Sequence, residues 1–195
     1  MKKLSFIILV LLIVSCKQTS EKKSTTEDIS TEKVTKTEIN NSVPDTIDDN
    51  MMLLGIVNQK GFENDNFIEW FKENYNGHIL DTLTIKEIKP KLKEVSIKVF
   101  MGTWCSDSQR EVPALYKVIK EAEFDTANLT MIAVSQEKDT PNQLEKGLNI
   151  EYVPTIIFYK NDKEIGRYVE LAQETLEKDM LAILNETGYK HSYEE

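Results

Sequence analysis

The chain has 195 residues, which is enough for one domain with appendages, and its hydrophobic content of 40% can supply a globular core. The formal net charge of -9, without a stripe of lysine or arginine, argues against a nucleic-acid-binding protein. The two cysteines, Cys16 and Cys105, lie in unlike surroundings, so we expect no structural disulfide between them.

The first 15 residues have the pattern of a signal peptide. Lys2 and Lys3 precede an apolar run over 4–15 that is too short to be read as a membrane span. The run ends in Ile-Val-Ser-Cys, which resembles the lipobox of bacterial lipoproteins and implies a lipid on Cys16. The lipid would anchor the protein to a bacterial membrane, facing the periplasm or the exterior. A simple secretion signal or a short uncleaved anchor are the alternatives.

Residues 16–50 are dominated by Ser, Thr, Lys, Glu, Asn and Asp. Such a stretch cannot bury enough apolar surface to offset the entropy lost on ordering, so we predict a disordered tether without a binding role. The folded domain is then expected over 51–190.

Apolar patterning within this domain predicts its elements in chain order. Phe67, Phe71 and Tyr75 recur at a spacing of four and predict a helix over 62–75. A weaker helical stretch follows over 84–93, where Pro90 argues against a regular helix. Alternating apolar residues then predict a strand over 95–101.

The second half continues the alternation of helix and strand. A helix is expected over 105–121 and a buried strand over 129–134. Thr140 and Pro141 suggest the start of a short helix that stops near Gly147. Two strands over 155–159 and 164–169 flank a turn. The spacing of Leu176, Met180, Ile183 and Leu184 then predicts a final amphipathic helix, which Gly188 ends. The order β-α-β…β-β-α predicts an α/β fold with a mixed central sheet, helices on both faces and an N-terminal helical extension.

The segment that carries chemistry lies between the strand over 95–101 and the helix that follows. Cys105 opens this helix, where unpaired backbone N–H groups and the positive end of the dipole favour a thiolate. Ser108, one turn further on, can offer its hydroxyl or N–H to the sulfur, and Trp104 would shield one side. The negative charge of Asp107 works against the dipole.

This segment resembles the active-site motif of the thioredoxin superfamily, in which Trp-Cys-x-x-Cys begins the second helix. Pro113 matches the proline of that helix. Gly-Thr-Trp-Cys followed by Glu-Val-Pro is similar to the membrane-anchored TlpA/ResA type of thiol-disulfide oxidoreductase, and it implies that Glu111 lies in a cavity beside the cysteine. Residues 152–155 (Tyr-Val-Pro-Thr) resemble the cis-proline loop that faces the reactive sulfur. The resemblance implies a cis bond at Pro154 and a substrate groove along Val153, Thr155 and Asp107.

The sequence departs from this family at the second cysteine, which is Ser108 here. Because Cys16 is expected to carry lipid, a mixed disulfide at Cys105 has no internal route of release. Val99 also occupies the place of the buried aspartate of cytosolic thioredoxins.

We therefore expect a monothiol oxidoreductase that acts in cell redox homeostasis. It would exchange with protein thiols or disulfides and depend on an external thiol reductant. A non-catalytic module that binds a partner polypeptide in the cis-proline groove is the rival, and a peroxidase-like enzyme with a sulfenic acid at Cys105 is a third reading. We expect a monomer without cofactor or metal, because His78 and His191 have no ligand spacing.

Overall fold

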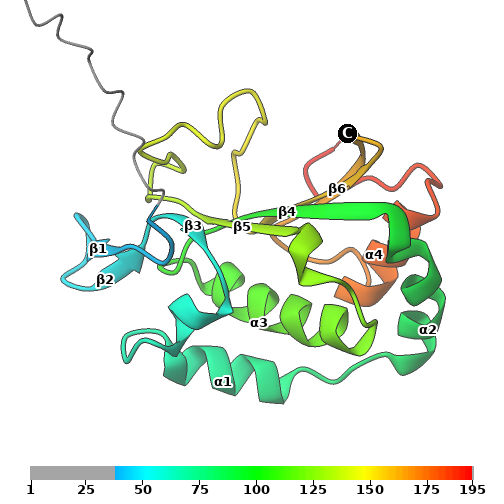
Figure 1. Cartoon of the computed structure of the whole chain (residues 1–195), viewed down its shortest axis with the longest axis horizontal. Coiled ribbons are helices and arrows are strands. Elements are labelled where there is room, and N and C mark those ends of the chain that lie inside the picture. Colours follow the sequence, from blue (N-terminus) through cyan, green and yellow to red (C-terminus); the bar gives the residue numbers. More distant parts are fainter. Residues whose placement is uncertain (1–37, 195) are drawn as a thin grey trace, which may run out of the picture. The chain divides into compact units, whose positions relative to one another are not determined.

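The computed structural model describes residues 38–194, which belong to one compact unit (Figure 1). The predicted leader, the lipidation site at Cys16 and most of the predicted tether lie outside the described residues. Among residues 38–194, none of the helices combines the length and the apolar character that crossing a membrane requires.

A five-stranded mixed sheet lies at the centre, in the order β3-β5-β4-β6-β7. The strands are β3 (Gly55–Val57), β4 (Val95–Met101), β5 (Leu129–Ala133), β6 (Thr155–Lys160) and β7 (Lys163–Val169). β4 pairs in parallel with β5, and every other pair is antiparallel. The predicted parallel pair and the predicted C-terminal hairpin are both confirmed.

The helices gather on one face of this sheet (Figure 1). They are α1 (Ile68–Gly77), α2 (Thr82–Lys91), α3 (Ser106–Glu121) and α4 (Leu176–Leu184). Alternate residues of β4, among them Ile97 and Val99, point into the main core, where they meet Val112, Leu115 and Ile119 of α3. The period-two strand pattern and the helical period thus meet in one apolar layer. The predicted α/β fold with a mixed central sheet flanked by helices is confirmed, but α1, α2, α3 and α4 lie on one face of the sheet, whereas helices were predicted on both faces.

The opposite face of the sheet carries a smaller cluster that includes Phe100 and Ile157. The segment 135–150 covers it with Leu144 and Leu148, and this segment consists of turns. The prediction of a short helix from Thr140 is therefore wrong. Gln143, inside the predicted range, has a φ of 53°, which a right-handed helix excludes, and Lys138 and Asn149 on either side of the range have φ values of 64° and 52°.

The predicted helix over 62–75 is divided in two. A short 3-10 helix, η1 (Gln59–Glu63), is capped by the Asn58 side chain, which accepts a hydrogen bond from Lys60 N. α1 begins only at Ile68. α2 begins after Asp81, whose side chain accepts from Thr84 N, and it retains Pro90 near its end. The remaining short 3-10 turns are η2 (Leu92–Glu94) and η3 (Thr126–Asn128).

The folded part begins before Met51, in contrast to the predicted boundary. β1 (Ser42–Pro44), which lies within the stretch that was expected to be tether, pairs antiparallel with β2 (Met51–Leu53). Backbone hydrogen bonds from Asn40 N to Ile56 O and from Leu54 N to Asn41 O fix this segment. Because backbone groups rather than apolar side chains hold it, a search for hydrophobic periodicity does not detect it.

Candidate functional site

Cys105 lies at the junction between β4 and α3, where it is the N-cap residue with φ -91° and ψ 123°. Its side chain is half-buried, and its Sγ donates a hydrogen bond of 3.2 Å to the backbone oxygen of Val153. The Val153–Pro154 bond is cis, as predicted. The sequence resemblance thus brought together two segments, 102–108 and 152–155, that meet in space at this sulfur.

Ser108 occupies the position of the second cysteine one turn into α3, and it is fully buried. Its Oγ accepts a hydrogen bond of 3.1 Å from the backbone N of Gly102. No hydrogen bond joins Ser108 to Cys105 among residues 38–194. The hydroxyl therefore ties the start of the helix to the end of β4.

Trp104 is fixed against the backbone of the same loop. Its Nε1 donates a 3.0 Å hydrogen bond to Val134 O, and its ring lies so close to Gly102 that a Cβ there would be 2.5 Å from Cε2. Lys138 Nζ lies 5.9 Å from the ring centroid, a cation–π distance. These contacts fix the position of the ring, and shielding of the Cys105 sulfur by Trp104 stays a prediction.

Asp107 does not stand alone at the helix start. Arg110, one turn further on, places Nη2 at 2.7 Å from Asp107 Oδ1 and Nε at 2.8 Å from Glu111 Oε1. The positive charge of Arg110 therefore offsets the negative charge of Asp107 near the thiol. Sequence reasoning missed Arg110, although its i,i+3 spacing from Asp107 was a usable signal.

Glu111 is 9% exposed, so its carboxylate is held inside the protein. It lines a cavity of about 500 Å³ between α1, α3 and the start of α4, together with His78 and Leu176. Burial, and then the negative charge of Glu111, raise the pKa of Tyr168 on β7. Neither Cys105 nor Pro154 lines this cavity, so the structure does not bring Glu111 and the cysteine into one space.

The cis-proline loop is held from both sides. Thr155 Oγ1 donates a 2.7 Å hydrogen bond to Tyr152 O, and Pro154 O accepts one of 2.7 Å from Glu170 N. Val153 is buried in the smaller cluster, on the face of the sheet opposite the helices. The loop therefore presents its backbone to Cys105 from a fixed position.

The C-terminal segment 189–194, which sequence reasoning left without a role, borders this loop. Tyr193 stacks on Tyr152 with ring centroids 3.9 Å apart and an interplanar angle of 10°. Its hydroxyl donates to a carboxylate oxygen of Glu170. Burial, followed by the negative charge of Asp107, raises the pKa of Glu170. The two tyrosines of a tail beyond the last amphipathic helix were the available signal.

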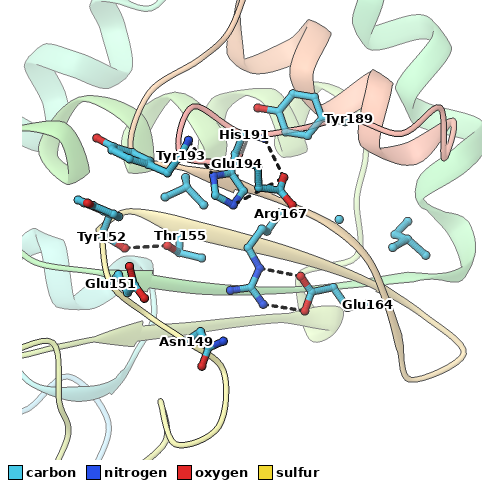
Figure 2. A pocket seen from close by; sticks show the side chains of 13 residues that line it. Asn149, Glu151, Tyr152, Thr155, Glu164, Arg167, Tyr189, His191, Tyr193 and Glu194 are labelled. Atoms are coloured by element: carbon cyan, nitrogen blue, oxygen red, sulfur yellow. Dashed lines mark hydrogen bonds and ion pairs between the residues drawn. The ribbon is translucent and has the colours of Figure 1, made fainter.

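A cavity of about 670 Å³ lies between this segment and β7 (Figure 2). Tyr152 and Tyr193 lie at one end of it, and the ion pair of Arg167 with Glu164 lies further along, with N–O distances of 2.6 and 2.8 Å. Arg167 also donates to Leu148 O at 2.8 Å. The cavity therefore adjoins the cis-proline loop, and among residues 38–194 its lining contains one arginine, whose guanidinium is paired with Glu164.

The two histidines serve as polar contacts. His78 Nε2 lies 2.8 Å from Glu177 Oε1, and His191 Nε2 lies 3.7 Å from Glu194 Oε2. Across the described part of the chain, no three His, Cys, Asp or Glu side chains form a group that could hold a metal ion.

Comparison with known proteins places this geometry in a family. A family model described as thioredoxin matches residues 63–183, more than half of the chain. None of the curated proteins matches. A protein of unknown function from Pseudomonas aeruginosa is 18% identical, with a TM-score of 0.45, and the match covers 60% of this chain and 81% of that one. Mitochondrial thioredoxin 3 from Saccharomyces cerevisiae, in its oxidized form, is 21% identical, with a TM-score of 0.29, and the match covers 48% and 84% of the two chains. Because the family model covers more than half of the chain, and the chain has a mixed sheet and a cis-proline loop, the chain belongs to the thioredoxin family.

Proposed function

We propose that the chain carries out thiol–disulfide exchange through one reactive cysteine, Cys105. Its thiolate attacks one sulfur of a protein disulfide, the old S–S bond breaks, and the other sulfur leaves as a thiolate with the electron pair. A first external thiolate then attacks the Cys105 sulfur of the mixed disulfide and releases the substrate as a thiol. A second external thiolate attacks the disulfide now formed at Cys105, restores the Cys105 thiolate and leaves the two external thiols joined as a disulfide. The position of Ser108 makes this release intermolecular.

One observation supports the proposal above the others. Cys105 is half-buried at the N-terminus of α3, with its Sγ 3.2 Å from the backbone oxygen of Val153. A helix N-terminus favours the thiolate, and the adjoining loop offers backbone groups to an incoming polypeptide. The ion pair of Arg110 with Asp107 reduces the repulsion that Asp107 alone would exert on that thiolate.

The assignment of the chain to one type within the thioredoxin family is also a proposal. We assign the chain to the membrane-anchored TlpA/ResA type on the motif around Glu111, with a lipid on Cys16 and a location in the cell envelope. Glu111 acts in this proposal as a positioning residue, because it binds Arg110, which pairs with Asp107 beside the thiol. Glu111→Gln is then expected to change the pH profile of Cys105 alkylation, while Glu121→Gln on the same helix leaves it unchanged.

Ser108→Cys is the experiment that tests the exchange reaction. The test uses full-length chains that carry Cys16→Ser, so that Cys105 is the natural thiol under study. The parent chain should form a mixed disulfide with a model disulfide and keep it until an outside thiol is added. Ser108→Cys should form an internal disulfide and reduce insulin when supplied with reductant, and Ser108→Ala, the matched control, should gain nothing.

Failure of Cys105 to form any mixed disulfide would favour the non-catalytic alternative, in which the cis-proline groove only binds a polypeptide. The hydrogen bond from Cys105 Sγ to Val153 O favours this alternative, because the thiol proton is donated to a backbone oxygen. Consumption of peroxide with a thiol reductant would identify the peroxidase-like reading instead.

The anchor is tested separately, by fractionating cells that produce the chain with and without Cys16→Ser. The expected outcome is that the substitution releases a soluble form or blocks processing of the leader. Normal processing together with retention in the membrane fraction would contradict a lipid at Cys16.

A further inference from the structure

We infer that the cavity between β7 and the C-terminal segment 189–194 binds a lysine or arginine side chain of the polypeptide whose cysteine reacts with Cys105. This inference rests on the proposed function, since it specifies the substrate of the same site. Its grounds are the position of the cavity, its aromatic rings and its charge.

The position of the cavity links it to the reactive sulfur. Tyr152 and Thr155 line the cavity and flank the Val153–Pro154 bond, and the oxygen of Val153 lies 3.2 Å from Cys105 Sγ. An extended polypeptide advances about 3.3 Å per residue. A chain bound at Cys105 thus reaches the cavity within a few residues of its own cysteine.

The aromatic rings provide a surface for a cation. Tyr152 is 38% exposed and Tyr193 is 42% exposed, although the two rings stack on each other. Figure 2 shows both rings at the end of the cavity nearest the loop. Guanidinium and ammonium groups are attracted to the faces of such rings, and an arginine can also stack on them.

The charges of the cavity favour the same ligand. Within residues 38–194, Glu151 has neither an ion-pair partner nor a hydrogen-bond partner, and it is exposed. Glu164 neutralises Arg167, and Glu194 lies beside His191. Because Glu151 lacks a counter-charge, the lining carries excess negative charge at neutral pH.

A second cavity, next to Trp104, is acidic as well. This cavity, of about 240 Å³, is lined by Trp104 together with Asp45 and Asp48, and no lysine or arginine lines it. Two cations of the surrounding residues already have partners: Arg110 pairs with the carboxylates of Asp107 and Glu111, and Lys138 lies over the Trp104 ring. A substrate with basic residues around its cysteine therefore meets complementary charge at both cavities, and a substrate with acidic residues there is repelled.

The test compares peptides that differ in one residue. Each has a single cysteine joined to 5-thio-2-nitrobenzoate, with arginine, norleucine or glutamate placed two to four residues away. Attack by the Cys105 thiolate on the peptide sulfur forms the mixed disulfide and releases the coloured thiolate, and mass spectrometry identifies the product. The protein is the full-length chain with Cys16→Ser.

We expect the arginine peptide to react about two- to fivefold faster than the norleucine peptide at its best position, with glutamate slowest. Glu151→Gln and Tyr193→Ala should each reduce this preference, and added salt should weaken it. Tyr193→Phe, which keeps the ring, should retain most of it. Glu87→Gln, at an exposed carboxylate on α2, is the matched control and should change nothing.

Two outcomes separate this inference from the proposed function. Equal rates for the three peptides, with rapid reaction of all, would overturn the basic-residue site while leaving thiol exchange intact. No reaction, even with the corresponding disulfide of N-acetylcysteinamide, would overturn the exchange function. In that case the basic-residue site is tested by the binding of peptides that have alanine in place of cysteine, since binding requires no thiol exchange. If the arginine peptide binds no better than the norleucine peptide, the cavity does not select a basic residue.

Discussion

The Trp104 ring lies against the backbone of Gly102 so closely that a methyl group at position 102 would come within 2.5 Å of Cε2. Gly102→Ala should therefore displace the ring and break the hydrogen bond from Nε1 to Val134 O. We expect a loss of about 1–3 kcal/mol in the free energy of unfolding, as for other overpacking substitutions. Loss of this shield should also speed alkylation of Cys105, which a thiol-trapping assay measures.

Gly77→Ala is the control for this substitution. Gly77 ends α1, and a Cβ there would have nothing within 4 Å, so alanine should leave both stability and alkylation close to those of the parent chain. Equal behaviour of the two variants would show that the loop accommodates a side chain at position 102 and that Trp104 is not a shield.

Much of this fold could be predicted because apolar periodicity is strong where a strand or helix has one buried face. β4 matches its predicted range, and α4 begins at Leu176 as predicted but ends at Leu184, before the predicted end at Gly188. The junction that carries Cys105 lies directly after β4. The cis-proline loop was recognised from its motif alone. It has no periodic pattern, so composition and spacing would not have found it.

The parts that were missed are held by contacts without a periodic pattern. The strand β1 depends on backbone hydrogen bonds, and the segment after Thr140 turns through residues with positive φ. The contact of Tyr193 with Tyr152 joins residues far apart in sequence. The two tyrosines of the polar tail indicate a packing contact but do not reveal which ring each will meet, so the cavity beside the loop could not be predicted.

Thr103 connects the loop between β4 and α3 to the N-terminal hairpin, because its Oγ1 accepts a 3.1 Å hydrogen bond from the buried N of Leu53. Thr103→Val keeps the shape and removes the acceptor, which leaves a buried N–H unpaired. The expected cost is about 1–3 kcal/mol in the free energy of unfolding. Hydrogen exchange at the Leu53 amide should accelerate, and Thr103→Ser, which retains the hydroxyl, should remain close to the parent. Slow exchange in the valine variant would contradict this role.

Glu177 makes stability depend on pH. Burial alone would raise its pKa, but the hydrogen bonds from His78 and from backbone N–H groups outweigh burial, so the pKa is lowered from its usual 4.5. A carboxyl whose pKa is lower when folded stabilises the protein above the unfolded pKa and loses that contribution as the pH falls through the folded pKa. The melting temperature of the parent should therefore fall as the pH drops below about 4.5, and Glu177→Gln should have a shallower dependence in this range.

The control for that titration is Glu87→Gln, which changes an exposed carboxylate on α2 and should reproduce the steep dependence of the parent. If Glu177→Gln and Glu87→Gln follow the same curve between pH 3 and 6, the contact between His78 and Glu177 does not govern acid stability.

Asp179 anchors the segment that forms one wall of the proposed substrate cavity. Its Oδ2 accepts hydrogen bonds from Gln173 N at 2.6 Å and from the Tyr189 hydroxyl at 2.9 Å, and its Oδ1 accepts from Glu174 N at 3.2 Å. The carboxylate is 3% exposed, so each of these three donors depends on it. Burial, followed by the negative charge of Asp179, also raises the pKa of Tyr189.

Asp179→Asn replaces one acceptor oxygen with an NH₂ group that faces N–H or O–H donors. The loss should reach about 2–4 kcal/mol, because a charge-assisted acceptor disappears and a buried donor is left without a partner. Tyr189→Phe removes a single hydrogen bond and should cost only about 0.5–1.5 kcal/mol. Both variants release the tail at Tyr189, so amides of residues 189–194 should exchange faster in each, whereas those of α4 should be affected mainly by Asp179→Asn. The discrimination between arginine and norleucine peptides should fall in both variants, while the rate with a small neutral disulfide stays that of the parent. Unchanged discrimination in Tyr189→Phe, with faster exchange in the tail, would show that the order of this segment does not contribute to substrate selection.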